Sequence, residues 1–372
     1  MLFNFNSPTD IYFGQGYFSK TAEITNNIGT NPLIVCGRNS MRKNKYIEQI
    51  SNNFSKSKKK FILYENISPD AKSNEINEAI SIVKKNKNDF IIGLGGGSVI
   101  DAAKAIAVGV CYSNIEEIIG KTVEASSKHL PIVAIPTTSG TGSEVSKGSI
   151  ITDINKNFKS GIRGNSLFPK IAIIDPIFSL TLPNNILAET GFDAFTHLFE
   201  SYLAKKSNPI TEKFSEEGIS LILKYLPLSL KKKDLEIKEK ICFAALIGGI
   251  NVANASTCLP HRLQQAMGSV KEVSHPHARG LACVYPSWLK EEYKYSFKKI
   301  NKLKKNLKIN SGKFDFILDF MNKIKVNNCL TDYSVKNEHI DIFINNISGN
   351  LENDPIKKID NNLIKKIYLN SL

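Results

Sequence analysis

A chain of 372 residues exceeds the usual size of a single hydrophobic core, so we expect two domains. Hydrophobic residues make up 42% and charged residues 23% of the sequence, which are the proportions of a folded globular protein and not of a disordered one. The formal net charge of +14 comes from lysines scattered in short runs without interleaved aromatic residues, and this pattern argues against a nucleic-acid-binding function.

No apolar run is long enough to span a membrane, and the N-terminal stretch lacks the basic start and apolar core of a signal peptide. The six cysteines are scattered without paired spacing, which favours reduced thiols over a disulfide framework. We therefore expect a cytoplasmic protein that binds neither membranes nor nucleic acid.

The first part of the chain alternates apolar, β-branched runs with helical stretches. Strands are expected at residues 32–37, 60–66, 89–97, 131–138 and 171–176. Helical periodicity is expected at residues 73–86 and 99–111. Continuous apolar strands separated by helices predict a Rossmann-like, largely parallel sheet that is covered on both faces. This is a nucleotide-binding architecture.

After Pro183 the strand signals disappear, and the sequence continues with helical periodicity and short loops. We therefore divide the chain into an α/β domain, residues 1–180, and an all-helical domain, residues 181–372.

A glycine cluster follows the strand expected at 89–97. Gly95, Gly96, Gly97 and Ser98 would let backbone N–H groups approach a pyrophosphate, and the following helix would supply partial positive charge. The spacing is not GxGxxG, so a tight turn alone would also explain the glycines. Asp101 is either a part of the cofactor site or an acid favoured by the helix dipole.

A second loop, "PTTSGTGSEVS" at residues 136–146, follows another buried strand and carries many hydroxyl groups. The hydroxyl residues assigned to the cofactor site are Thr137, Thr138, Thr141 and Ser143. So many polar groups on one loop are a poor structural choice unless a polar ligand satisfies them. Two such loops in one α/β domain favour a dinucleotide.

Candidate metal ligands lie in the second domain. Asp193 and His197 are four residues apart on an expected helix, so both side chains can aim at one point. Four of the six histidines fall between residues 197 and 277, namely His197, His261, His275 and His277. One carboxylate and three imidazoles would hold a divalent ion that keeps a net positive charge and polarises a carbonyl.

The motifs taken together resemble the iron-containing (group III) alcohol dehydrogenase family over nearly the full length of the chain. In order, they are "FGQG", "GGGSVIDAAKAIA", "PTTSGTGSEVS", "ITD", "DP" and "LPNNILAETGFDAFTHLFESYLA". The resemblance implies a dehydroquinate-synthase-like fold, with NADH or NADPH in the first domain and Fe²⁺ or Zn²⁺ in the second. We also expect a homodimer.

The resemblance implies that the metal ligands are Asp193, His197, His261 and a last histidine. The stretch "SHPHARG" departs from the usual Pro-His-Gly of the family, so the last ligand is either His275 or His277. His277 is preferred, because "HARGLACVYP" continues the family pattern without a gap.

The implied reaction is metal-assisted hydride transfer between a nicotinamide and an aldehyde. By family position Lys159 would reach the cofactor or the substrate, although it could also be one more surface lysine. Members that prefer NAD often carry an acid where this chain has Gly37, followed by Arg38. We therefore predict that NADPH is preferred, with Arg38 or Arg42 pairing with its 2′-phosphate.

Only five of the 49 basic residues are arginines, and the planar fork of an arginine suits phosphate and carboxylate. Arg262 and Arg279 lie one and two residues from proposed ligands, and Arg163 lies near Lys159. They are either substrate-binding residues for an anionic aldehyde or members of structural ion pairs.

The block "STCLPHRLQ…SH…GLA…YP" resembles the branch of the family that reduces phosphonoacetaldehyde to 2-hydroxyethylphosphonate in phosphonate biosynthesis. We therefore predict a phosphonoacetaldehyde reductase. The alternative within the family is a general dehydrogenase for short-chain or anionic aldehydes. More distant alternatives are a zinc polyol dehydrogenase, a dehydroquinate-synthase-like lyase and a non-catalytic basic binding protein.

Overall fold

The structure is a computed structural model that describes residues 2–273 and 275–372. The chain folds as two compact units. The first is an α/β unit, Asn6–Leu182, and the second is a helical unit, Pro183–Leu372, which also includes the start of the chain as far as Phe5.

A six-stranded parallel sheet forms the centre of the α/β unit, with the strand order β1-β8-β5-β4-β2-β3. Its strands are β1 Asp10–Phe13, β2 Pro32–Gly37, β3 Ile62–Ile67, β4 Phe90–Gly95, β5 Ile132–Pro136 and β8 Ile171–Ile174. The central strands are buried along almost their whole length, as expected for a parallel sheet that is covered on both faces. The Rossmann-like parallel sheet predicted from the sequence is confirmed.

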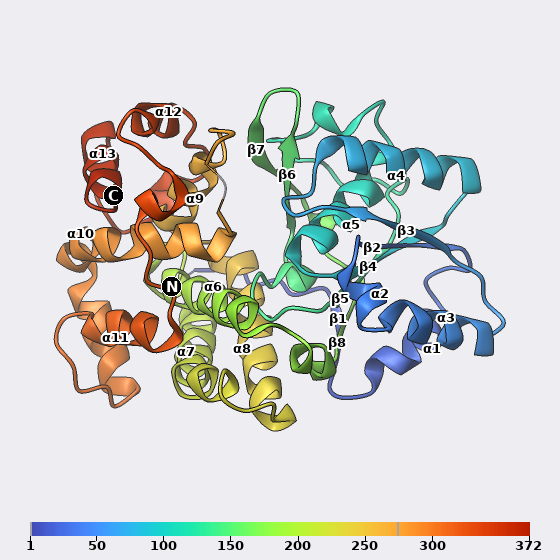
Figure 1. Cartoon of the computed structure of the whole chain (residues 1–372), viewed down its shortest axis with the longest axis horizontal. Helices are drawn as coiled ribbons and strands as arrows, with labels where there is room; N and C mark the ends of the chain where they lie inside the picture. The colour runs from blue at the N-terminus through green and yellow to red at the C-terminus, as the bar shows by residue number, and fades with distance from the viewer. Residues whose placement is uncertain (1, 274) are drawn as a thin grey trace. The chain divides into compact units, whose positions relative to one another are not determined.

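Helices cover both faces of this sheet (Figure 1). They are α1 Thr21–Ile24, α2 Ser40–Lys43, α3 Tyr46–Lys56, α4 Ser73–Asn86 and α5 Gly97–Gly109. One apolar cluster lies between the sheet and α4 with α5, and another lies between the sheet and α1 to α3. Helix α5 approaches β4 closely, since a Cβ added to Gly93 would lie 2.9 Å from the Cβ of Ala103.

Two features of the α/β unit were not predicted. The edge strand β1 is short and half exposed, so it lacks the apolar run that marks the central strands. The strands β6 Gly148–Asp153 and β7 Phe158–Arg163 form an antiparallel hairpin outside the main sheet, in which buried and less buried residues alternate along β6.

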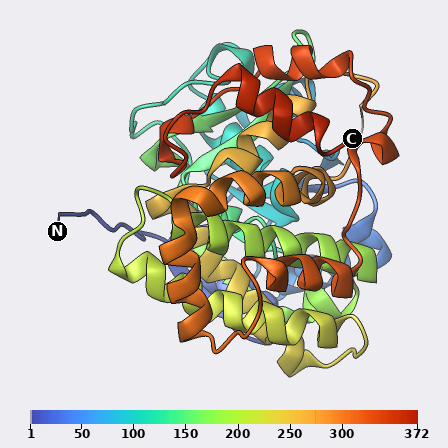
Figure 2. The same cartoon turned by 90° about the vertical axis from the view of Figure 1, so that its left-hand side faces the viewer.

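The helical unit consists of α-helices of different lengths, which face the viewer in Figure 2. They are α6 Asn184–Leu203, α7 Pro209–Ser229, α8 Leu235–Ala255, α9 Leu259–Met267, α10 His277–Asn306, α11 Asp315–Ile324, α12 His339–Asn345 and α13 Asn361–Leu369. Short 3₁₀ helices η6, Leu330–Tyr333, and η7, Leu351–Asn353, lie between the last α-helices. The predicted all-helical character of this part of the chain is confirmed.

Glycines allow α6 and α7 to pack closely. A Cβ added to Gly191 would lie 2.5 Å from a methyl carbon of Leu226, and one added to Gly218 would lie 2.6 Å from a methyl carbon of Leu198. Larger residues at these positions would force α6 and α7 apart and shift the helix that carries Asp193 and His197.

Within the described residues, no single helix is both long enough and apolar enough to cross a membrane. In the described part of the chain, one bent pair of helices, α8 and α9, passes that test of length and composition, and the two helices meet at an angle of 97°.

Candidate metal centre and cofactor loops

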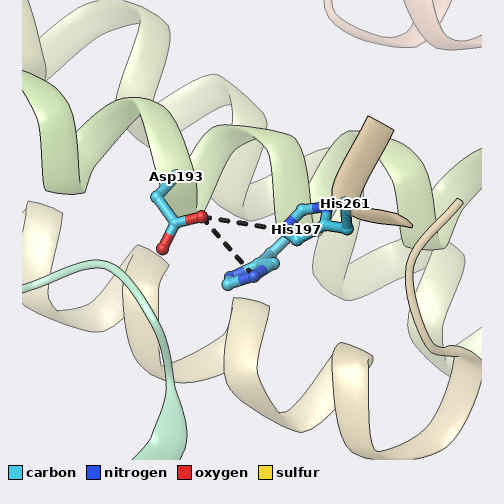
Figure 3. A group of neighbouring side chains, drawn as sticks. All are labelled: Asp193, His197 and His261. Atoms are coloured by element: carbon cyan, nitrogen blue, oxygen red, sulfur yellow. Dashed lines mark ion pairs between the residues drawn. The ribbon is translucent and has the colours of Figure 1, made fainter. Parts of the chain in front are cut away.

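Four candidate ligands from three helices converge on one point. Asp193 and His197 lie on α6, His261 lies on α9, and His277 is the first residue of α10. The Oδ1 atom of Asp193 lies 3.6, 3.7 and 3.4 Å from the Nε2 atoms of His197, His261 and His277, respectively. Ligand atoms about 2.1 Å from a tetrahedral ion are roughly 3.4 Å apart, so the spacing fits a divalent metal. Figure 3 shows Asp193, His197 and His261 turned toward one another.

The burial of these groups also fits a metal ion. Asp193, His197 and His261 are buried, and their potential ligand atoms all lie within 4.8 Å of one another. Among the residues that the structure describes, the Asp193 Oδ1 and His261 Nε2 atoms are buried without a hydrogen-bond partner. Unsatisfied buried polar atoms are costly, and a bound cation would satisfy both.

The protonation states of two of the ligands, Asp193 and His197, favour metal binding. Burial alone would raise the pKa of Asp193, but the charges of His197 and His277 hold this pKa well below its ordinary value. Burial lowers the pKa of His197 to about 4. A charged carboxylate and a neutral imidazole at neutral pH are the forms that bind a metal.

Two further residues orient the histidine ligands. The Nδ1 atom of His261 lies 2.8 Å from Oε2 of the fully buried Glu200, and Nδ1 of His277 lies 2.5 Å from Oε1 of Gln264. Because both oxygens accept hydrogen bonds, each Nδ1 carries the proton and each Nε2 is left to face Asp193. Burial would lower the pKa of His261, but the charge of Glu200 raises it to about 9, so without a metal this ring also carries a proton on Nε2 at neutral pH, and a bound ion would displace it.

Neither orienting residue was identified from the sequence. Glu200 lies seven residues after Asp193, on the same face of α6, so the helical spacing held a signal for it. Gln264 lies three residues after His261 on α9, but its partner His277 belongs to another helix.

Of the two histidines considered for the last ligand, the structure brings His277 to the Asp193 carboxylate. The His275 ring packs beside the Tyr333 ring instead, with 5.9 Å between the ring centres. This geometry supports the choice of His277.

The three arginines proposed to bind substrate differ in their surroundings. Arg279 donates to Glu189 Oε1 at 2.9 Å, to the Lys325 carbonyl at 2.8 Å and to Asn328 Oδ1 at 2.7 Å. These contacts favour the structural interpretation for Arg279, because they tie the start of α10 to α6 and to the residues after α11.

Arg262 and Arg163 lie in different units. Arg262 is 7% exposed, follows His261 on α9 and donates to Thr257 Oγ1 at 3.1 Å. Arg163 ends β7 in the α/β unit and donates to the Gly161 carbonyl at 3.1 Å. Of the three arginines, Arg262 is the one that directly follows a metal ligand in the chain, and its guanidinium also donates to Gln265 Oε1 at 3.4 Å and to Ser256 Oγ at 3.5 Å.

The two proposed cofactor loops follow adjacent parallel strands. Gly95 at the end of β4 is paired with Pro136 at the end of β5, and the Thr137 N–H donates to the Gly95 carbonyl at 2.9 Å. A Cβ added to Gly97 would lie 2.4 Å from Thr141, and one added to Gly96 would lie 3.4 Å from Thr138. The glycines therefore permit the close approach of the two loops as well as that of a cofactor.

Two residues assigned to the cofactor, Asp101 and Ser143, are also bonded to each other. The Ser143 hydroxyl donates to Asp101 Oδ1 at 2.5 Å, and the Ile150 N–H donates to Asp101 Oδ2 at 2.9 Å. The fully buried Lys104, which the sequence reading missed, donates to Ser143 Oγ at 2.8 Å and to the Gly148 carbonyl at 2.9 Å. Asp101 and Ser143 thus hold the second loop against α5.

The remaining proposed cofactor residues lie at the ends of neighbouring strands. Gly37 ends β2, which lies beside β4, and Arg38 follows it. The Arg38 guanidinium donates to Glu75 Oε1 at 2.9 Å, and Arg42 donates to Glu65 Oε2 at 2.5 Å.

Lys159 is connected to the glycine loop through one residue. Its Nζ atom lies 2.5 Å from Asp70 Oδ1, and the Asp70 N–H donates to Ser98 Oγ at 3.1 Å. Lys159 is thus an ion-paired residue beside the glycine loop and not an isolated surface lysine.

The α/β unit has a parallel sheet and two glycine-containing loops, and the helical unit brings nitrogen and oxygen ligands to one point. Together these features define a two-domain, metal-dependent dehydrogenase. Residues 8–176 match the family model "Iron-containing alcohol dehydrogenase", and residues 187–372 match "Fe-containing alcohol dehydrogenase family, C-terminal". The chain belongs to the iron-containing alcohol dehydrogenase family.

Three known proteins illustrate the similarity. A probable NADH-dependent butanol dehydrogenase 1 of Bacillus subtilis is 26% identical in an alignment that covers 94% of this chain and 94% of its own. An NADPH-dependent butanol dehydrogenase of Clostridium saccharobutylicum is 26% identical over 99% of this chain and 97% of its own. The crystal structure of a sulfoacetaldehyde reductase from Bifidobacterium kashiwanohense in complex with NAD⁺ is 25% identical, with a TM-score of 0.87 over 99% of this chain and 98% of its own.

The family membership establishes the enzyme class. This protein is an NAD(P)-dependent, iron-type alcohol dehydrogenase or aldehyde reductase, and its cofactors are Fe²⁺ or Zn²⁺ with NADPH or NADH. The non-catalytic alternative is therefore wrong.

Proposed function

We propose that this enzyme reduces phosphonoacetaldehyde to 2-hydroxyethylphosphonate with NAD(P)H, as a step of phosphonate biosynthesis. The observation that carries the proposal is Arg262, a buried cation directly after the metal ligand His261. An arginine that directly follows a metal ligand offers a planar fork of donors, which suits an anionic substrate.

The similarity to a known protein supports the proposal that the substrate is an anion. The fold neighbour named as a sulfoacetaldehyde reductase acts on an aldehyde that carries an anionic sulfonate. A phosphonate has the same tetrahedral shape and a higher charge, and it suits the planar fork of an arginine. Other small phosphorylated or carboxylated aldehydes form the second candidate class.

The residues of the helical unit have different roles in this reaction. Asp193, His197, His261 and His277 would hold the divalent ion, while Glu200 keeps the His261 ring in the orientation that presents Nε2. When it is bound, the ion supplies Lewis acidity toward the aldehyde oxygen. Arg262 binds the phosphonate and sets the distance between the anionic group and the reacting carbonyl carbon.

The α/β unit binds the nicotinamide cofactor through the loops after β4 and β5. Backbone N–H groups of the glycine loop and the N-terminus of α5 bind the pyrophosphate. We further propose that NADPH is preferred, because Gly37 offers no carboxylate to the ribose and the adjacent Arg38 side chain is 59% exposed. The predicted homodimer and cytoplasmic location remain predictions.

The substrate assignment is tested by comparing kcat/KM for phosphonoacetaldehyde and for propanal. In Arg262→Ala the phosphonate should lose about 2–4 kcal/mol of transition-state stabilisation, whereas propanal should be nearly unaffected. Arg279→Ala and Arg163→Ala are matched controls that test the other two predicted arginines. Equal activity of the wild type on both aldehydes, or an equal loss for both in Arg262→Ala, would contradict the assignment.

The cofactor preference is tested by comparing kcat/KM for NADPH and for NADH. Arg38→Ala should reduce kcat/KM for NADPH by about tenfold or more, the effect of losing a charge-assisted hydrogen bond, and leave NADH nearly unchanged. Arg42→Ala tests the second candidate, and Lys43→Ala removes an exposed charge nearby as a control. A wild-type enzyme that uses NADH more efficiently than NADPH would show that the preference is wrong.

A further inference from the structure

The connector between α8 and α9, Ala255–Leu259, holds one residue in a strained conformation. Ser256 has φ 62° and ψ −175°. Almost only glycine adopts this region, because the Cβ of an L-residue is crowded there. Such a conformation persists only where the surrounding structure fixes it.

Asn353, at the end of η7, fixes the strained residue from both sides. Its Nδ2 group donates to the Ala255 carbonyl at 2.8 Å and to the Thr257 carbonyl at 3.0 Å, the two carbonyls that flank Ser256. The Asn353 side chain is 2% exposed, and its Oδ1 atom accepts the Lys206 N–H at 3.2 Å. One buried amide group therefore bridges the connector across its strained residue.

Other contacts complete the fixation of the connector. The Ser201 hydroxyl donates to the Ser256 carbonyl at 3.0 Å. The Cys258 N–H donates to Glu200 Oε2 at 2.7 Å, and the Leu259 N–H donates to Asp354 Oδ2 at 2.9 Å. Three chain segments thus hold a connector of five residues: α6, η7 and the residue after η7.

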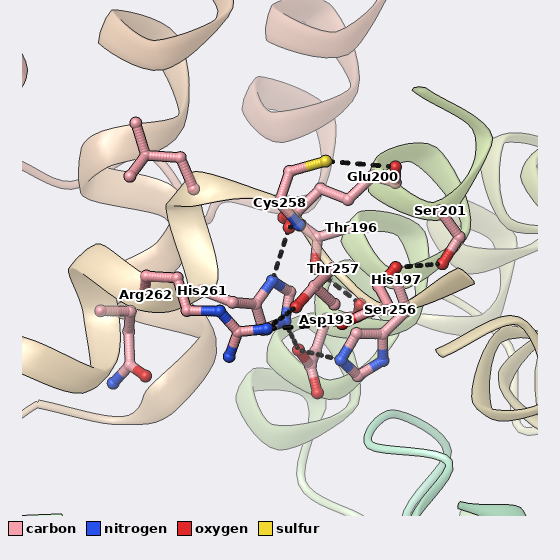
Figure 4. Close-up of polar contacts among 12 residues, drawn as sticks. Asp193, Thr196, His197, Glu200, Ser201, Ser256, Thr257, Cys258, His261 and Arg262 are labelled. Carbon is pink, nitrogen blue, oxygen red and sulfur yellow. Dashed lines mark hydrogen bonds and ion pairs between the residues drawn. The ribbon is translucent and has the colours of Figure 1, made fainter. Parts of the chain in front are cut away.

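The connector leads directly into the metal centre. It ends at the start of α9, two residues before His261, and the carboxylate that accepts the Cys258 N–H also contacts the His261 ring. Figure 4 shows the Glu200 and Ser201 side chains of α6 beside the connector and His261. A change in the path of the connector would therefore move His261 relative to Asp193.

We propose that Asn353 is a positioning residue for the metal centre: it holds the strained connector so that His261 meets Asp193 and His197 at one point. The inference rests on the metal centre described above. It assigns a role to a residue that binds neither metal nor substrate and that lies 92 residues from His261 in the sequence.

The test measures the affinity of the metal-free protein for Co²⁺ by absorbance titration against a competing chelator. Asn353→Ala removes both bonds to the connector and should weaken Co²⁺ binding about tenfold or more, as expected for residues that orient metal ligands. Asn251→Ala is the matched control, since Asn251 is fully buried and its Nδ2 group donates to Thr211 O at 2.9 Å and to Ser215 Oγ at 2.8 Å. It should lower the thermal midpoint and leave the Co²⁺ affinity unchanged.

A rescue variant separates positioning from general stability. Glycine adopts the conformation of Ser256 without steric cost, so Ser256→Gly combined with Asn353→Ala should bind Co²⁺ more tightly than Asn353→Ala alone. If Asn353→Ala does not fold, Asn353→Ser, which keeps one donor, takes its place and should show a smaller loss.

The possible results distinguish a failure of the proposed metal centre from a failure of the positioning role of Asn353. A wild-type protein that does not bind Co²⁺ overturns the metal centre and the inference with it. A wild-type protein that binds Co²⁺ while Asn353→Ala binds equally well overturns the inference alone. Equal losses of affinity in Asn353→Ala and Asn251→Ala would also overturn it, because they would reflect stability and not positioning.

Discussion

The Glu200 carboxylate is the residue on which the geometry of His261 depends most directly. It contacts the His261 ring at 2.8 Å and the Cys258 N–H at 2.7 Å, and it is fully buried. A carboxylate in this position fixes the imidazole tautomer and increases the basicity of the ligand nitrogen.

We therefore expect Glu200→Gln to weaken metal binding about 10–100-fold, the usual effect of removing such a partner. The substitution keeps the size of the side chain and removes its charge. Isothermal titration with Zn²⁺ measures the effect. Glu216→Gln, at another buried glutamate of the helical unit, is the control and should bind Zn²⁺ like the wild type. An unchanged affinity in Glu200→Gln would show that the contact does not orient His261.

At the level of single residues, the sequence indicates the proposed metal ligands more readily than the acidic partners of the arginines. Asp193 and His197 share a helix, and their spacing alone places them on one face. The acid partner of Arg38 is Glu75, 37 residues away, and that of Arg42 is Glu65, 23 residues away. The pairing of β2 with β3 brings the segments of Arg42 and Glu65 together, whereas Glu75 lies on α4, and the sequence offers no local pattern for either contact.

The buried amine of Lys104 connects helix α5 to the loop that follows β5. The Lys104 amine donates to Ser143 Oγ at 2.8 Å and to the Ser146 and Gly148 carbonyls at 2.9 Å each. Burial lowers the pKa of Lys104 to about 8, with the charges of Asp101 and Glu144 acting in the opposite direction. This loop is the second of the two proposed cofactor loops.

Lys104→Met should raise the dissociation constants of NADH and NADPH by about tenfold, because it leaves buried acceptors of the loop without a donor. Fluorescence titration of the cofactors measures this change. Metal affinity in the same variant serves as an internal control and should stay as in the wild type. Lys56→Met, at an exposed lysine of α3, should change neither quantity. Wild-type cofactor binding in Lys104→Met would contradict this role.

At the level of elements, the sequence predicted what an apolar run or a helical period can reveal. The helix expected at residues 73–86 is α4, with the same bounds, and the strand expected at 32–37 is β2. Helix α5 begins at Gly97, two residues before the expected start, because glycines there belong to the helix as well as to the turn. The hairpin of β6 and β7 and the edge strand β1 were missed, because neither is a continuous buried run.

The pH dependence of stability is a property of the whole molecule. The buried acid Glu292 contributes to it, and the shift of its pKa determines the direction of that contribution. Glu292 on α10 is fully buried, and its pKa is raised from 4.5 to about 9, first by burial and then by the charge of Asp354. The folded protein therefore keeps a proton that the unfolded chain releases above pH 4.5. Between these two pH values the contribution of Glu292 to stability decreases as the pH rises.

Glu292→Gln cannot ionise, so its thermal midpoint should exceed that of the wild type at pH 8, and the difference should shrink toward pH 5. Thermal unfolding followed by circular dichroism at both pH values measures it. The neighbouring Glu291→Gln is the control with the opposite sign, because bonds from Lys294 and Lys366 lower the pKa of Glu291. The thermal midpoint of Glu291→Gln should lie below that of the wild type, and this difference should shrink as the pH falls. A pH-independent difference in Glu292→Gln would contradict the prediction.

The order in which strands and connector residues occur along the chain has a consequence for protein synthesis. Strand β1 pairs with β8, about 160 residues later, and the connector around Ser256 is fixed by Asn353, 97 residues later. At roughly 5–20 residues per second, the nascent β1 waits about 8–32 s for its partner. His261 likewise leaves the ribosome well before the amide that positions it. We therefore expect iron to be loaded after translation has passed residue 353, and a ribosome stalled before that point to carry a chain that binds metal poorly.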